Sequence, residues 1–153
     1  MKKIIYLAFL LALIAPQGIA QIFEGDNGLY YAANDLLYQG KYSEKFQNGM
    51  VKTEMEFKNG LLNGNVKTYF ENGTLSEVRA FKMGQKNGTW LTYNEQGKLT
   101  GEANYENDKK HGRWLVYDDN GVLRSEMHYH KGTKTGLWKQ FDENGKLINE
   151  QRF

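Results

Sequence analysis

Residues 99–122 read LTGEANYENDKKHGRWLVYDDNGV, and this pattern recurs along the chain every 24 residues. Glycines, aromatic residues and aliphatic residues each keep the period. The recurring positions are Gly49, Gly73, Gly97, Gly121 and Gly145; Gly64, Gly88, Gly112 and Gly136; Phe57, Phe81, Tyr105, Tyr129 and Phe153; Val51, Leu75, Leu99, Leu123 and Leu147; Val66, Trp90, Trp114 and Trp138; and Tyr69, Tyr93, Tyr117 and Phe141. A fixed period of this size indicates a stacked array, in which each unit buries surface only against its neighbours.

Each repeat has the pattern of two strands and two turns. In residues 99–105, Leu99, Gly101 and Tyr105 alternate with polar side chains, which is the periodicity of a strand. We expect a turn from Asn107 to Gly112 and a short strand from Trp114 to Tyr117. Asn-Gly dipeptides, which favour the positive φ angles of hairpin turns, recur along the chain. The sequence therefore predicts an all-β fold: a single-layer antiparallel β-meander built from 24-residue hairpin repeats.

The chain divides into three regions. Residues 1–20 have a basic start, an apolar run and small residues at Gly18 and Ala20, which is typical of a secretory signal peptide cleaved before Gln21. Residues 21–45 match the repeat poorly, and we interpret them as an N-terminal capping hairpin. Residues 46–153 hold four repeats and a closing half-repeat. We therefore expect an exported protein of the periplasm, the cell envelope or the medium.

The composition excludes several classes of function. The chain has no cysteine and only three histidines, so thiolate metal sites and cysteine nucleophiles are excluded. Its net charge of +2 equals the contribution of Lys2 and Lys3, so residues 21–153 are neutral and give no argument for nucleic acid. The sequence gives no sign of a cofactor.

The aromatic residues are the first candidate binding surface. Trp114 and Tyr117 are three residues apart, so in a regular strand they face opposite sides. Repetition of this pair predicts aromatic ladders on both faces of a thin sheet. Such ladders either stabilise the sheet by cross-strand stacking or serve as a docking surface, and both alternatives stay open here. The candidate partner-binding tryptophans are Trp90, Trp114 and Trp138.

The turns carry an organised charge. Four segments within the repeats (58–65, 82–89, 106–113 and 130–137) have a combined charge of +6, and four segments between repeats (70–73, 94–97, 118–121 and 142–145) have −6. In a meander these two classes of turn lie on opposite edges. The basic edge either maintains solubility or contacts an acidic partner or phospholipid headgroups. Its candidate binding residues are Lys109, Lys110 and Arg113.

Residues suited to catalysis are few. His128 and His130 share one side of a strand, but His111 lies in another turn, so we expect no metal site. The carboxylates of Glu54, Glu102, Glu126 and Glu150 recur with the repeat, which indicates architecture with Lys or Arg partners rather than one acid–base site. We predict no catalytic residue and no enzymatic activity.

The repeat resembles MORN repeats, in particular the bacterial variant known as antitoxin-like. The resemblance covers about 46–153, and its core is Tyr105–Tyr117 followed by the Asn120-Gly121 turn and Glu126. It implies a non-catalytic module that binds another protein or itself, or contacts acidic phospholipid. Because a cytoplasmic antitoxin would not need residues 1–20, we expect an exported protein-binding or scaffold module. The alternatives are an antitoxin or immunity-like protein that holds a toxin, and a binder of phospholipid or glycan surfaces.

Overall fold

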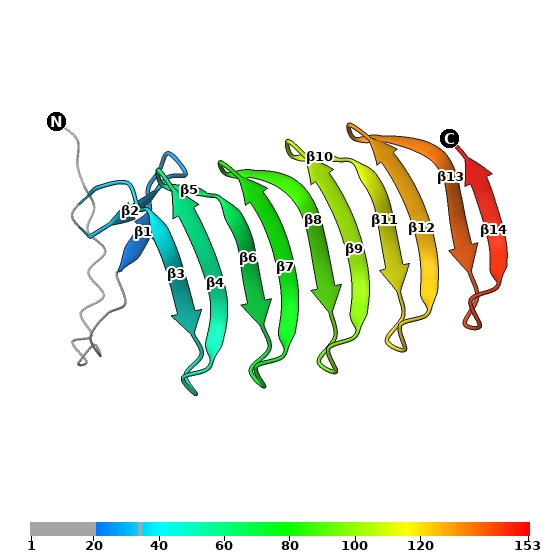
Figure 1. Cartoon of the computed structure of the whole chain (residues 1–153), viewed down its shortest axis with the longest axis horizontal. Helices are drawn as coiled ribbons and strands as arrows, with labels where there is room; N and C mark the ends of the chain where they lie inside the picture. The colour runs from blue at the N-terminus through cyan, green and yellow to red at the C-terminus, as the bar shows by residue number, and fades with distance from the viewer. Residues whose placement is uncertain (1–20, 34) are drawn as a thin grey trace.

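The computed structural model describes residues 21–33 and 35–153, and these residues form β-strands joined by short turns (Figure 1). The predicted signal peptide, residues 1–20, lies outside the described residues. The strands are β1 (Ile22–Glu24), β2 (Tyr30–Ala32), β3 (Gly40–Lys45), β4 (Val51–Lys58), β5 (Leu61–Leu62), β6 (Gly64–Tyr69), β7 (Leu75–Lys82), β8 (Gln85–Tyr93), β9 (Leu99–Glu106), β10 (Lys109–Lys110), β11 (Gly112–Tyr117), β12 (Leu123–His130), β13 (Thr133–Phe141) and β14 (Leu147–Arg152).

The strands from β3 to β14 form one 12-stranded antiparallel sheet in chain order. The short strands β5 and β10 pair with β4 and β9 and continue into β6 and β11. The hairpins lie side by side in a single layer, with the turns within repeats along one long edge and the turns between repeats along the other (Figure 1). The predicted single-layer antiparallel meander of hairpin repeats is confirmed.

The turn within each repeat has only two residues. Glu106 pairs with Lys109, so Asn107 and Asp108 alone form the turn, and their φ angles are 48° and 65°. Two successive positive φ angles define the turn whose twist matches that of the flanking strands. The expected turn from Asn107 to Gly112 is therefore wrong, because the strand resumes at Lys109.

A bulge follows each of these turns. In the third repeat Tyr105 pairs with Lys110 and Glu102 with Leu115, so two residues of β9 face four residues of the opposite strand. The recurring glycine lies in this bulge with a positive φ angle, which is 70° for Gly112 and 108° for Gly88. This backbone conformation is why glycine recurs here.

A second bulge recurs beside the turns between repeats. Val116 pairs with Ser125 and Tyr117 with Leu123, so Arg124 is left without a partner residue. Because opposite residues share a face, Leu123 lies on the face of Tyr117, away from Trp114. The second face therefore differs from our expectation: its rings, which are three tyrosines and Phe141, each lie opposite a leucine and do not form a ladder of rings.

The N-terminal region is smaller as a cap than its sequence suggests. β1 and β2 form a separate two-stranded sheet, whereas β3 is an edge strand of the large sheet and pairs with β4. Gly40 has a φ angle of 107°, close to the 119° of Gly64 one period later. β3 is thus the second strand of an incomplete repeat, although residues 21–45 were all assigned to the cap.

Successive repeats are connected through their turns. The second turn residue donates its backbone N–H to a carbonyl of the preceding repeat, as in Gly84 to Leu62 (2.7 Å), Asp108 to Lys86 (3.0 Å) and Gly132 to Lys110 (2.7 Å). Among the described residues Phe57 and Leu115 are the only buried hydrophobic side chains, and they remain 3% and 5% exposed. The contacts between neighbouring hairpins therefore replace a conventional core.

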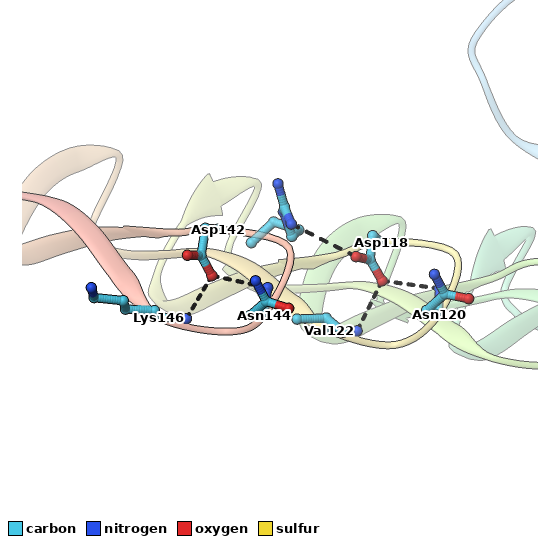
Figure 2. Close-up of polar contacts among 7 residues, drawn as sticks. Asp118, Asn120, Val122, Asp142, Asn144 and Lys146 are labelled. Carbon is cyan, nitrogen blue, oxygen red and sulfur yellow. Dashed lines mark hydrogen bonds and ion pairs between the residues drawn. The ribbon is translucent and has the colours of Figure 1, made fainter.

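The turns between repeats are held by acidic and amide side chains at their first or third position. The Asp118 carboxylate accepts hydrogen bonds from the backbone N–H groups of Asn120 and Val122, both at 2.9 Å (Figure 2). Asp142 accepts from Asn144 and Lys146 at the same distance one period later (Figure 2). Part of the negative charge on this edge therefore has a structural role.

We predict that Asp118→Ala lowers the free energy of unfolding by about 1 kcal/mol, because the turn loses an acceptor for two backbone N–H groups. The matched control is Asp119→Ala, which removes the same charge from an exposed position of the same turn and leaves these two bonds intact. Urea unfolding of both variants measures the difference. Equal losses would mean that net charge, not hydrogen bonding, stabilises the turn.

Candidate binding surface

One face of the sheet carries a continuous row of rings in tilted or edge-on contact, which we call the aromatic row. It runs across every strand pair from β7 to β14, with neighbouring ring centroids between 4.7 and 5.5 Å apart. Its members are Phe81, Trp90, Tyr105, Trp114, Tyr129, Trp138 and Phe153. These rings thus pack against each other across the strands, as the stabilising alternative requires, but at interplanar angles of 48–64° rather than in parallel stacks.

The row is interrupted near the N-terminal end. Val66 occupies the tryptophan position of the first full repeat, between Phe57 and Phe81. Phe57 instead packs against Tyr30 and Tyr38, with centroids 4.8 and 5.6 Å away. The described rings therefore form two groups, one at the cap and one from β7 to β14.

Each tryptophan also binds the backbone. The indole N–H groups of Trp90, Trp114 and Trp138 donate to carbonyls ten residues earlier at 3.0, 2.9 and 3.0 Å. For Trp114 the acceptor is Asn104, which lies opposite the bulge and also accepts from the N–H of His111. All three tryptophans are half-buried. Their polar atoms are thus occupied within the sheet, and only part of each ring remains exposed.

A lysine covers each tryptophan. The ammonium groups of Lys86, Lys110 and Lys134 lie 5.0, 4.3 and 4.4 Å from the ring centroids of Trp90, Trp114 and Trp138. Each also lies within 5.3 Å of the next ring of the row. At such distances a cation is attracted to the ring face. The face therefore presents an alternating row of cations and aromatic rings.

The six candidate residues do not form one patch. Trp90, Trp114, Trp138 and Lys110 share the face of the aromatic row, where Lys110 lies opposite Tyr105. Lys109 pairs with Glu106 and Arg113 with His128, which places both on the other face. Lys86 and Lys134 were not among the residues predicted from the sequence. The signal was available, because these residues precede and follow Lys110 by 24 positions.

The histidines lie differently from our expectation. His111 belongs to the preceding repeat, as expected, but its ring lies 5.2 Å from that of His130. The reason is that successive turns lie side by side, so that the backbone N–H of Lys131 donates a hydrogen bond of 3.5 Å to Nδ1 of His111. In residues 21–33 and 35–153, no group of three or more acidic, histidine or cysteine side chains is arranged to hold a metal ion.

The recurring carboxylates have mixed partners. Glu126 lies 3.8 Å from Lys139, as predicted, whereas Glu54 accepts a hydrogen bond of 2.7 Å from the Tyr69 hydroxyl and Glu102 one from Asn104. Burial, and then the bond to Glu54, raise the pKa of Tyr69 above its ordinary value. These groups serve the sheet individually and are not combined into a site.

A shallow hollow of about 640 Å³ lies over β3, β4 and β6. Its lining alternates in sign, with Lys41, Glu54, Glu56 and Lys67. It presents no single charge to a ligand. Across the described part of the chain, no helix is long and apolar enough to cross a membrane.

Hairpins of fixed length, stacked in one layer and joined by their turns, define a β-hairpin repeat protein. A family model described as MORN repeat variant matches residues 38–59, 62–82, 86–107, 110–131 and 134–153, and the chain belongs to this family. MORN repeats are in general modules that bind proteins or membranes. No curated protein matches this chain.

We predict that Trp114→Ala lowers the free energy of unfolding by about 2–3 kcal/mol, since a half-buried ring loses two ring neighbours and a backbone hydrogen bond. Trp114→Phe keeps a ring in the row and should cost about 1 kcal/mol. Val116→Ala, at an exposed position of the same face, should cost less than about 0.5 kcal/mol. Urea unfolding with an unchanged denaturant slope measures all three. Full stability of Trp114→Ala would contradict a structural role for the row.

Proposed function

We propose that this protein is a non-catalytic module that binds another protein through the face of the aromatic row. The supporting observation is the row of Lys86, Lys110 and Lys134 over the tryptophans of a sheet face that no other strand of the described residues covers. An open surface with cations and rings that recur along it is suited to an extended acidic segment of a partner. Charge complementarity would orient the partner, and the exposed parts of the rings would supply contact area.

The lysines are the sharper test, because their substitution spares the rings that stabilise the sheet. We expect the triple variant Lys86→Gln, Lys110→Gln and Lys134→Gln to lose its partner in native co-purification while its thermal unfolding changes little. The matched control is the triple variant Lys82→Gln, Lys109→Gln and Lys131→Gln. These lysines are exposed on the same edge and lie over no ring of the described residues. Equal loss from both triples would indicate general charge attraction, and no loss from either would contradict this docking face.

A membrane surface is the second candidate, favoured by the +6 charge of the turns on one edge. Flotation with vesicles containing anionic lipid distinguishes it, because lipid binding by surface charge is reversed at high salt. An antitoxin or immunity role predicts a different result in co-purification: a single toxin in stoichiometric amount. A scaffold role predicts several partners.

We also propose that the protein is exported, on the support of the basic start, apolar run and small residues of 1–20. Export would place the partner in the periplasm, the envelope or the medium. The mature chain should begin at Gln21, and mass spectrometry of the protein from its own host measures this. An intact Met1 on the mature protein would contradict the proposal.

A further inference from the structure

The C-terminal end of the sheet has an open edge. Among residues 21–33 and 35–153, β14 is the last strand of the sheet and pairs only with β13. All six of its residues are exposed. Ile148 is 63% exposed, and Phe153, which follows the strand, is 43% exposed. An edge strand of this kind presents unpaired N–H and C=O groups to any strand that can align with it.

The register identifies which backbone groups face outward. The N–H of Phe153 donates to the carbonyl of Gly136 in the preceding strand, and alternate residues of a strand point the same way. The backbone N–H and C=O groups of Gln151 and Asn149 therefore point toward β13, where these residues pair with Trp138 and Gln140. Glu150 and Arg152 are left with backbone groups pointing outward, and no described strand pairs with that side.

At the other end of the sheet β3 is also an edge strand, but residues of the cap cover part of it. The N–H of Tyr38 donates to the carbonyl of Tyr30 in β2, and the Tyr38 hydroxyl donates to the carbonyl of Lys41 in β3. The rings of Tyr30 and Tyr38 cover Phe57, which is only 3% exposed. A second copy adding head to tail would meet these cap residues at β3.

We propose that the open edge of β14 pairs with β14 of a second copy of the chain, antiparallel and around a two-fold axis. The axis is perpendicular to the sheet, so residues that face each other must lie on the same face. This condition allows only registers in which one residue of β14 lies opposite the same residue of the second copy.

Charge selects one of these registers. With Gln151 opposite itself, Glu150 of each copy lies opposite Arg152 of the other, and these are the residues whose backbone groups face outward. Two such pairs exchange four backbone hydrogen bonds and bring opposite charges together twice. With Glu150 opposite itself, two carboxylates would meet, which is destabilising.

The charged edges of the sheet favour the same arrangement. β14 begins after the acidic segment 142–145 and ends beside the basic segment 130–137, which contains the turn between β12 and β13 (Figure 1). Antiparallel pairing places the acidic turn of one copy beside the basic edge of the other. Head-to-tail addition would instead place the acidic edge of one copy beside the acidic edge of the next, and the basic edge beside the basic edge.

The contact is short, and short contacts are characteristic of weak, concentration-dependent dimers. Because the two-fold pairing uses up the open edge, it closes at two copies. The inference rests on the proposed binding role, since the partner it assigns is a second copy of the chain. Its test uses the purified protein alone, so its failure leaves binding of another protein untouched.

The first experiment is a charge exchange followed by sedimentation over a concentration series. Arg152→Glu or Glu150→Arg alone places like charges opposite each other twice and should weaken the dimer about tenfold. The double variant restores both pairs and should recover the affinity of the native chain. Circular dichroism checks that each variant stays folded, because β14 also pairs with β13.

The second experiment uses the absence of cysteine from the chain. In the proposed register the two Gln151 residues lie about 4.5 Å apart at their Cα atoms, within the range of a disulfide. Gln151→Cys should therefore give a covalent dimer on mild oxidation. Gln140→Cys, exposed one strand inward, should remain monomeric.

Three results would overturn the proposal. The native chain could sediment as a monomer at every concentration. The charge-exchanged double variant could stay as weak as the single variants, which would exclude the register. Assemblies larger than two copies would indicate head-to-tail addition at the cap instead.

Discussion

Burial between neighbouring hairpins is the constraint on which this fold depends. A single-layer sheet has no opposing layer, so each hairpin gains apolar contact only from the strands beside it. The tryptophans meet this requirement in three ways: each ring packs against two others, donates its N–H to the backbone, and lies under a lysine. One side chain thus joins consecutive strands and satisfies a carbonyl at the bulge.

The period made the fold predictable, because it states which residues are equivalent without any knowledge of structure. Backbone irregularities were harder to foresee. The turn at Asn107 and Asp108 and the bulge at Gly112 are separate features, but both use residues with turn propensity, so they merge into one long turn in the sequence. No residue pattern in the sequence marks the bulge at Arg124. This bulge nevertheless places Leu123 on the same face of the sheet as Tyr117.

The candidate site was only partly predictable for a related reason. Lys109, Lys110 and Arg113 form a cluster in the sequence, but neighbours on a strand face opposite sides, so only Lys110 joins the tryptophans. Residues separated by a whole period, such as Lys86 and Lys110, are in equivalent positions in space. Periodicity is thus a better guide to this surface than local charge density. His111 and His130 illustrate the same point, since stacked turns bring them together.

The interruption at Val66 affects how the array opens. In a linear array, stability is a sum of unit terms and nearest-neighbour terms, and the weakest junction sets where cooperativity breaks. Between Phe57 and Phe81 the described residues provide no ring to connect the two aromatic groups. We therefore expect the array to divide into two units of local unfolding: the cap with β3 and β4, and the strands from β7 onward. Backbone amides in β6 should exchange with solvent hydrogen earlier than those of the strands around Trp114.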